Sequence, residues 1–392
     1  MSKRILYLTF YFEPDLCAGS FRNSQLAKDV ALRLNEVGVI DIITTMPNRY
    51  NTYKVKAEYF ESKNNYTIQR IKIPLHKSGI WDQINSFRVY FSGVLRLINK
   101  NEYDLVFASS SRFFTAFLGY YIASRRSIPL YLDIRDIFSE NIKGAINNIF
   151  LRLPLVAFLK VVERRVFKYA KYINLISPGF TDYFSPYQSK CFYFTNGIDD
   201  DFISVNHRAV KNNSNSVPKI ITYAGNIGEG QGLEKIIPLT AQKLQEKVHF
   251  IVIGDGGTKD KLSKSLNDLR LKNVELIEPV NRTRLIEYYL KSNYLLIHLN
   301  DMDAFKSVLP SKVFEYGAIG KPIIAGVSGY AKEFIEEQLP DSFIFRPCRW
   351  EELVEFLETD NPIKPQRDKF IERFKRSNVN RAMATSIVST IE

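Results

Sequence analysis

The sequence predicts an α/β protein built from two doubly wound, Rossmann-like domains that face a central cleft. The length of 392 residues is enough for two domains of about 150 residues or more. Short apolar runs alternate with polar loops and helical patterns along the chain. This alternation is interrupted at one place near the middle of the chain. The runs are continuous rather than alternating, which is typical of parallel strands between layers of helices.

The first half of the chain contains five apolar runs that predict buried strands. They are residues 4–10, 39–44, 105–108, 130–134 and 172–176. Ser20 is expected to cap a helix that runs to Leu34. Ser177 and Pro178 are expected to be the cap and the first residue of another helix.

An Asn- and Ser-rich stretch at residues 204–218 interrupts the alternation and is interpreted as a linker. It separates a first domain, residues 1–203, from a second domain, residues 219–371. The second domain repeats the strand and helix pattern. The last helix, about residues 372–392, is expected to pack back on the first domain, and ligands are expected at the carboxyl ends of the strands.

The composition excludes several classes of protein. With 45% hydrophobic and 24% charged residues the chain is neither disordered nor a collagen nor a coiled coil. Three distant cysteines predict no disulfide framework and no zinc site, which favours a reducing cytosol. No signal peptide is recognised, and the longest uncharged apolar stretch has 12 residues where a membrane crossing needs about 20.

The net charge of +12 is unevenly distributed. When the chain is divided at Val205, 27 basic and 18 acidic residues lie before the division, so the first half carries +9 of the charge. The densest segment, residues 143–171, has seven basic residues and one acid, and its apolar residues predict a basic amphipathic helix. Residues 84–100 form a similar stretch. These helices could lie on an anionic membrane surface, which we favour, or could cover a sheet with their charged faces in water.

Three glycine-bearing loops follow predicted strands and could hold phosphate groups at helix N-termini. They contain Gly19, residues 225–232 and residues 254–257. A fourth segment, residues 305–322, is the most specific. There Pro310 is expected to end the preceding stretch of chain, and Ser311 to cap the helix that begins next. Lys312 adds a cation at this helix end, and Glu315 could accept both hydroxyls of a ribose. The alternative for Glu315 is a solvated helix residue.

These motifs together resemble the family 4-type retaining glycosyltransferases with the GT-B fold. The resemblance is closest to bacterial polysaccharide and O-antigen enzymes that transfer aminosugars such as fucosamine. The matching stretches occur in the family's order over nearly the whole chain and include YFEPDLCAGSFR, LDIRDIFSE, LISPGF, FTNGID, TYAGNIGEGQGLE, VIGDG and LPSKVFEYGAIGKPIIA.

The resemblance implies a set of site residues. Glu315 would bind the ribose, Ser311 and Lys312 would lie near the diphosphate, and Asp136, after Arg135, would lie near the anomeric carbon. The implied catalytic residues are Asp136, Arg135 and Lys312. The implied donor-binding residues are Gly19, Gly225, Asn226, Gly228, Gly254, Pro279, Val280, His298, Leu309, Pro310, Ser311 and Glu315. For His298 a place in the core is an equal alternative, and for Asp136 a salt bridge or a helix cap is the alternative.

Some positions depart from the family pattern. The first of its paired glutamates is Ser307, and its diphosphate-gripping Arg and Lys are Asn226 and Gln231. Phosphate neutralisation is therefore left to Lys312, Arg135, Lys306 and the helix N-terminus. Asp301 and Asp303 have the spacing of an Asp-x-Asp metal motif but do not lie in a suitable loop, so no metal or other cofactor is expected. Residues 199–201 are interpreted as a solvated acidic turn.

The expected function is transfer of an aminosugar or deoxysugar, with retention, from a nucleoside diphosphate donor, UDP being favoured. The acceptor would be a lipid-linked sugar or an oligosaccharide in the synthesis of bacterial lipopolysaccharide or capsule. The expected location is the cytoplasmic face of the cell membrane, without nucleic acid as a partner. The alternatives are a nucleotide-sugar 2-epimerase of the same fold and a non-catalytic basic protein that binds nucleotides or nucleic acid.

Overall fold

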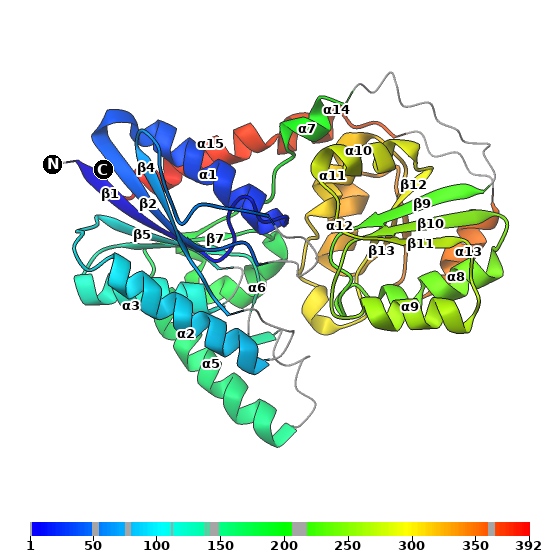
Figure 1. Ribbon diagram of the computed structural model, residues 1–392, viewed down its shortest axis with the longest axis horizontal. Coiled ribbons are helices and arrows are strands. Elements are labelled where there is room, and N and C mark those ends of the chain that lie inside the picture. Colours follow the sequence, from blue (N-terminus) through cyan, green and yellow to red (C-terminus); the bar gives the residue numbers. More distant parts are fainter. Residues whose placement is uncertain are drawn as a thin grey trace. The chain divides into compact units, whose positions relative to one another are not determined.

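The computed structural model describes residues 2–48, 55–74, 80–110, 113–137, 139–140, 149–205, 218–359 and 365–392. The chain forms two compact units (Figure 1). The first unit comprises Met1–Asn196 and Ser377–Glu392, and the second comprises Gly197–Arg376. Most of the predicted linker lies outside the described residues.

The unit boundaries differ from the predicted ones for a physical reason. The first unit ends at Asn196 rather than at residue 203, because α7 (Asp200–Ile203) buries Phe202 in the core of the second unit. The chain returns at Ser377 rather than at residue 372, because α14 (Asp368–Phe374) buries Phe370 and Phe374 in that same core.

The first unit contains an eight-stranded sheet of order β3-β4-β2-β1-β5-β6-β7-β8. Every described pair is parallel except β3 with β4. The central strands are buried on both faces, as their continuous apolar runs predict. The strands are β1 (Lys3–Thr9), β2 (Gly38–Thr45), β3 (Phe60–Ser62), β4 (Tyr66–Ile71), β5 (Leu105–Ser110), β6 (Leu130–Ile134), β7 (Tyr172–Leu175) and β8 (Cys191–Phe192).

Helices cover both faces of this sheet (Figure 1). On one face lie α2 (Ile80–Leu97), α3 (Phe113–Arg126) and α5 (Ile149–Tyr169). On the other lie α1 (Ala18–Leu34) and the returning helix α15 (Arg376–Val388), which share an apolar core with β1 and β2. The short helix α6 (Thr181–Phe184) follows β7.

One of the two predicted helix starts in this unit is confirmed and the other is wrong. The Ser177 hydroxyl accepts a hydrogen bond from the Gly179 N–H at 3.2 Å at the start of a short 3₁₀ helix that begins at Pro178. Ser20, in contrast, lies inside α1, which begins at Ala18 with Cys17 at its N-cap position. The Ser20 hydroxyl is buried and meets no hydrogen-bond partner in the described part of the chain.

The second unit contains a six-stranded parallel sheet of order β11-β10-β9-β12-β13-β14. The strand order reverses between β9 and β12, which is the switch point where doubly wound sheets bind ligands. The strands are β9 (Lys219–Ala224), β10 (Val248–Ile253), β11 (Val274–Ile277), β12 (Tyr294–His298), β13 (Ile323–Gly326) and β14 (Phe343–Phe345).

Two separate apolar clusters fill the space between this sheet and its helices. Besides α7 and α14, the helices are α8 (Ile237–Lys243), α9 (Lys259–Asp268), α10 (Arg282–Lys291), α11 (Lys312–Ile319), α12 (Tyr330–Gln338) and α13 (Trp350–Glu358). Both units are therefore parallel α/β layers of the predicted class. No described helix has the length and apolar character that a membrane crossing requires.

Candidate active site

Two glycines bring the loops after β9 and β10 into backbone contact. Gly225 and Gly254 have φ angles of +138° and +144°, which side chains rarely tolerate. The Gly225 N–H donates to the Ile253 carbonyl at 2.8 Å, and a Cβ atom on Gly254 would overlap the Gly225 carbonyl. These two predicted site residues are thus adjacent at the carboxyl edge of the sheet.

The Lys312 ammonium lies directly over this edge. Its Nζ atom is 4.7 Å from the centroid of the Tyr223 ring, and a Cβ atom on Gly225 would be 2.5 Å from the same Nζ. The Tyr223 hydroxyl in turn donates to the Asn226 carbonyl at 2.5 Å. Because Lys312 is also the first residue of α11, its charge adds to the positive end of the helix dipole, an arrangement suited to an anion.

Ser311 occupies the N-cap position of α11 but does not cap it. Its backbone is already helical, with φ −59° and ψ −25°, and its side chain makes no capping hydrogen bond. The predicted cap is therefore wrong. Leu309 is buried before this helix, and the Pro310 carbonyl accepts from the Val313 N–H at 3.1 Å, so the turn is closed by backbone groups.

Glu315 lies in the first turn of α11, and no residue in the described part of the chain donates a hydrogen bond to its carboxylate. Burial raises the pKa of Glu315 above its usual value, although the cations of Arg282, Lys312 and Arg376 act in the opposite direction. A half-buried carboxylate of this kind is able to accept hydrogen bonds from ligand hydroxyl groups. The structure thus brings Gly225, Lys312 and Glu315 into one region.

Asn226 and Gln231, which stand where the resemblance implies an Arg and a Lys, bind each other. Asn226 Nδ2 donates to Gln231 Oε1 at 2.7 Å, and the Gly228 N–H lies 3.3 Å from the same oxygen. The loop is therefore held by neutral groups. Lys306, which the sequence suggested as a further cation for phosphate neutralisation, is exposed and pairs with Asp303 at 2.7 Å.

His298 links three segments of the second unit and is neutral. Its Nδ1 atom lies 2.5 Å from the Gln231 carbonyl, and its Nε2 atom accepts from the Cys348 N–H at 2.9 Å. Burial lowers the pKa of His298 to about 4. Both ring nitrogens are used by backbone groups, so the structure supports the core alternative rather than a sugar contact.

Asn300, which the sequence did not single out, fixes the same glycine loop. Its amide donates to the Glu229 carbonyl at 2.8 Å, and its carbonyl oxygen accepts from Lys235 Nζ at 2.7 Å. Asn300 is the second residue after β12 and is buried, and an amide just past the end of a predicted strand was the available signal.

The acidic residues at 199–201 are not the solvated turn that we expected. Asp199 is half-buried and pairs with Arg282 at 2.8 Å and with Arg376. Asp201 is exposed and pairs with Arg282 at 3.0 Å. Pro279 and Val280 lie half-buried between β11 and α10, as the sequence predicts. Among the described residues no cluster of His, Cys, Asp or Glu has the composition of a metal site.

The first unit places Arg135 against the start of α1. Its guanidinium packs on Gly19 so closely that a Cβ atom there would overlap it. The Arg135 Nε and Nη1 atoms are buried and have no hydrogen-bond partner in the part of the chain that the structure describes. Asp136 follows and is exposed. Two predicted residues, Gly19 and Arg135, are therefore in contact.

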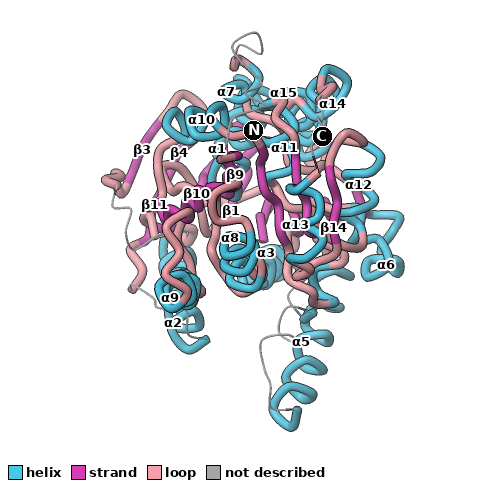
Figure 2. Tube along the Cα trace, turned by 90° about the vertical axis from the view of Figure 1, so that its right-hand side faces the viewer, coloured by secondary structure: helices cyan, strands magenta, loops and turns pink. Residues whose placement is uncertain are grey.

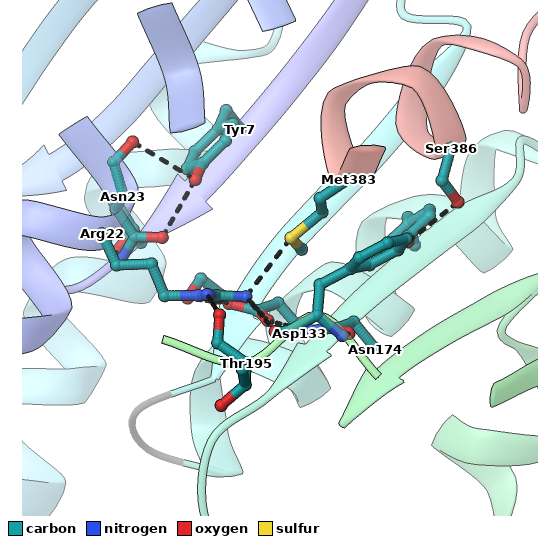
Figure 3. Close-up of polar contacts among 12 residues, drawn as sticks. Tyr7, Arg22, Asn23, Asp133, Asn174, Thr195, Met383 and Ser386 are labelled. Atoms are coloured by element: carbon teal, nitrogen blue, oxygen red, sulfur yellow. Dashed lines mark hydrogen bonds and ion pairs between the residues drawn. The ribbon is translucent and has the colours of Figure 1, made fainter. Parts of the chain in front are cut away.

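The first unit also contains a buried ion pair between Arg22 and Asp133 (Figure 3). Arg22 and Asp133 are both fully buried, with Arg22 Nη2 3.1 Å from Asp133 Oδ1. Asp133 also accepts from Ser109 at 3.0 Å and from Asn174 at 2.7 Å. Arg22 donates to the Thr195 carbonyl at 2.6 Å and contacts the Met383 sulfur at 3.3 Å (Figure 3).

Part of the sequence matches a glycosyl transferase family model and a curated glycosyl transferase. Residues 206–376 match the family model described as Glycosyl transferases group 1. A 114-residue stretch is 32% identical to the putative colanic acid biosynthesis glycosyl transferase WcaI of Escherichia coli K12. That match covers 29% of this chain and 28% of that protein.

Solved structures resemble nearly the whole chain. Sucrose-phosphate synthase from Thermosynechococcus elongatus has a TM-score of 0.73 at 13% identity, covering 98% of both chains. Anabaena HepE in complex with UDP-glucose has a TM-score of 0.69 at 14% identity, covering 98% of this chain and 99% of that one. WaaG, a glycosyltransferase involved in lipopolysaccharide biosynthesis, has 0.63 at 14% identity, covering 98% and 94%. The predicted GT-B fold is confirmed.

Proposed function

We propose that this chain, whose residues 206–376 match the group 1 glycosyl transferases, transfers a sugar from a nucleoside diphosphate donor in bacterial surface polysaccharide synthesis. The observation that carries the proposal is the Lys312 ammonium over Gly225 at the start of α11, one turn from the Glu315 carboxylate. A cation at a helix N-terminus fits a diphosphate, and a nearby carboxylate fits a ribose. UDP is the favoured nucleotide, which the UDP-glucose complex of HepE supports.

The finer parts of the proposal concern the sugar and the acceptor. The sugar would be an aminosugar or deoxysugar, and the acceptor a lipid-diphosphate-linked sugar or an oligosaccharide. The names of WcaI and WaaG, which refer to colanic acid and lipopolysaccharide, support a polysaccharide product.

The proposed reaction retains the anomeric configuration. The bond between the anomeric carbon and the diphosphate oxygen breaks, the acceptor oxygen forms the new bond on the same face, and the acceptor proton passes to the leaving diphosphate. Lys312 and the N-terminus of α11 stabilise the negative charge of the leaving group, which supplies most of the rate. Asp136 and Arg135 orient the acceptor or the sugar, and no metal ion takes part.

A thermal-shift panel of UDP, GDP and dTDP sugars, with EDTA present, tests the nucleotide. UDP compounds should raise the unfolding temperature, because ligands that bind the folded state stabilise it. A shift with GDP compounds and none with UDP compounds would contradict the donor assignment. The UDP sugar that raises the unfolding temperature is then used to distinguish the three candidate functions. A transferase releases UDP from it only when an acceptor is present. A 2-epimerase converts it to an isomerised sugar, and a binding protein does neither.

Helix α5 supports a membrane surface as a partner. Phe150, Leu153 and Phe158 are exposed by 85%, 61% and 63%, although they are large apolar side chains. Figure 2 shows the N-terminal turns of α5 standing away from the other helices of the first unit. The exposed cations Arg164, Arg165 and Lys168 follow on the next turns. An apolar end followed by cations is the pattern of a helix in the headgroup region of an anionic bilayer.

Replacing Arg164, Arg165 and Lys168 with glutamine should release the protein from vesicles of phosphatidylglycerol and phosphatidylcholine. Each cation near an anionic surface contributes about 1 kcal/mol, so the triple variant should bind at least about 100-fold more weakly. Lys171, also basic, is left intact because its Nζ donates to the Thr390 carbonyl at 3.0 Å.

The matched control replaces three exposed lysines of the second unit, Lys264, Lys272 and Lys291, and removes the same charge. Co-sedimentation measures both variants. Equal binding by the wild type and the α5 variant would contradict membrane contact through α5.

A further inference from the structure

Helix α5 has a single acidic residue, Glu163, on the side of the helix that faces the protein core. Its neighbours Arg164 and Arg165 are exposed, whereas Glu163 is only 2% exposed. No cation in the described part of the chain forms an ion pair with its carboxylate. Burying a carboxylate is costly unless hydrogen bonds compensate it, so the groups that surround Glu163 indicate what it does.

Both carboxylate oxygens of Glu163 accept hydrogen bonds. Oε1 accepts from the Ser139 backbone N–H at 3.2 Å, and Oε2 accepts from the Tyr183 hydroxyl at 2.5 Å. The Ser139 hydroxyl is 2.8 Å from the Tyr183 oxygen, which closes a ring of three residues. Burial and the hydrogen bond to Glu163 raise the pKa of Tyr183, so this phenol keeps its proton and donates.

This ring holds the far end of the segment that carries Arg135 and Asp136. The near end is held by β6, where the Ile176 N–H donates to the Ile134 carbonyl at 3.1 Å. Ser139 is fully buried, three residues beyond Asp136. The exposed Asp136 therefore lies on a short span with both ends attached.

A second link from α5 to this segment is weak. Lys160 Nζ is 3.9 Å from Glu140 Oε1, and both side chains are more than 30% exposed. Such a pair contributes little stability. Of these two links between α5 and the segment, the buried contact through Glu163 is therefore the stronger.

We propose that Glu163 is a positioning residue for Arg135 and Asp136, acting through Ser139 and Tyr183. The effect on the reaction rests on the proposed function, whereas the attachment of the segment does not. Because Glu163 belongs to the helix whose other side carries Phe150 and Phe158, it also connects the exposed side of α5 with the Arg135–Asp136 segment.

The test compares Glu163→Ala, Glu163→Gln and Tyr183→Phe in the full chain, with Glu140→Gln as the matched control that removes a carboxylate from the exposed link. Amide hydrogen exchange of the peptide covering residues 131–140 reports the attachment directly. Exchange at residues 135–139 should be at least about tenfold faster in Glu163→Ala and unchanged in Glu140→Gln, because exchange follows local opening. Glu163→Gln should lie between them, since its amide oxygen still accepts from the Ser139 N–H.

The second measurement is steady-state release of UDP, with acceptor present, from the UDP sugar that raises the unfolding temperature in the panel. The kcat should fall at least about tenfold in Glu163→Ala with the donor KM within about twofold, because the donor is expected to bind the second unit. Unchanged exchange in Glu163→Ala and Tyr183→Phe would overturn the proposal, as would faster exchange with unchanged kcat. If Glu163→Ala does not fold, Tyr183→Phe and Glu163→Gln decide in the same way. If the wild type releases no UDP from any donor with acceptor present, the proposed function fails and the exchange data alone decide the attachment.

Discussion

Replacing Arg22 with methionine is expected to lower the free energy of unfolding by about 3–5 kcal/mol. Methionine approximates the length of the arginine stem but leaves the Asp133 carboxylate buried and without its cation. The loss also removes the hydrogen bonds from Arg22 to the Phe194 and Thr195 carbonyls. Urea unfolding of the full chain, with hydrogen exchange of β6 and β7 to assign the change to the first unit, measures the effect.

The control is Lys3→Met in the same unit. Lys3 and Asp104 form an exposed pair at 3.5 Å, which should contribute about 0–1 kcal/mol. If Arg22→Met lowers the free energy of unfolding by no more than Lys3→Met does, the buried pair does not stabilise the unit.

The buried pair of Arg22 and Asp133 also makes the stability of the first unit depend on pH. Burial alone would raise the pKa of Asp133, but the Arg22 and Arg135 cations and the hydrogen bonds from Arg22 and Asn174 hold it below its usual value. The contribution to stability is therefore complete above the unfolded-state pKa of about 4 and is lost as the pH falls through the folded-state value. In Arg22→Met the pKa of Asp133 should rise, so the stability difference between this variant and the wild type should shrink towards low pH.

Replacing Lys312 with methionine is expected to lower kcat for sugar transfer by about 100- to 1000-fold. The methionine stem still covers Tyr223 and Gly225, so the packing is kept while the charge at the proposed diphosphate site is removed. UDP release with acceptor present measures the rate, and the unfolding temperature checks that the fold is intact.

Lys306→Met is the matched control, because this lysine lies six residues before Lys312 but is exposed and pairs with Asp303. Its kcat should stay within about twofold of the wild type. If both variants lose activity equally, the Lys312 ammonium does not specifically stabilise the leaving group.

Much of the fold follows from local patterns in the sequence. Continuous apolar runs such as residues 4–10 and 219–224 are sufficient to predict buried parallel strands, and the structure has β1 and β9 there. The position of Lys312 and Glu315 in the first turn of one helix also follows from the segment around Pro310. Such features depend on neighbours in the chain.

The features that could not be predicted depend on distant partners. Asp133 looks like one polar residue in an apolar strand, and its partner Arg22 is 111 residues away. The caps assigned to Ser20 and Ser311 were wrong because the register of a helix start is set by packing, not by the presence of a hydroxyl. The boundary at Asn196 was missed because residues 198–203 pack with residues 370–376, far along the chain.

The place of α15 in the chain determines the order in which the protein can fold during translation. A ribosome releases the chain from its N-terminus, so β1 and α1 emerge before the second unit. Met383, Ala384 and Ile387, which complete the core around them, are synthesised only after the entire second unit. The nascent first unit therefore keeps an apolar face of α1 uncovered while about 180 further residues are added, so a segment translated before the second unit is fully buried only after it.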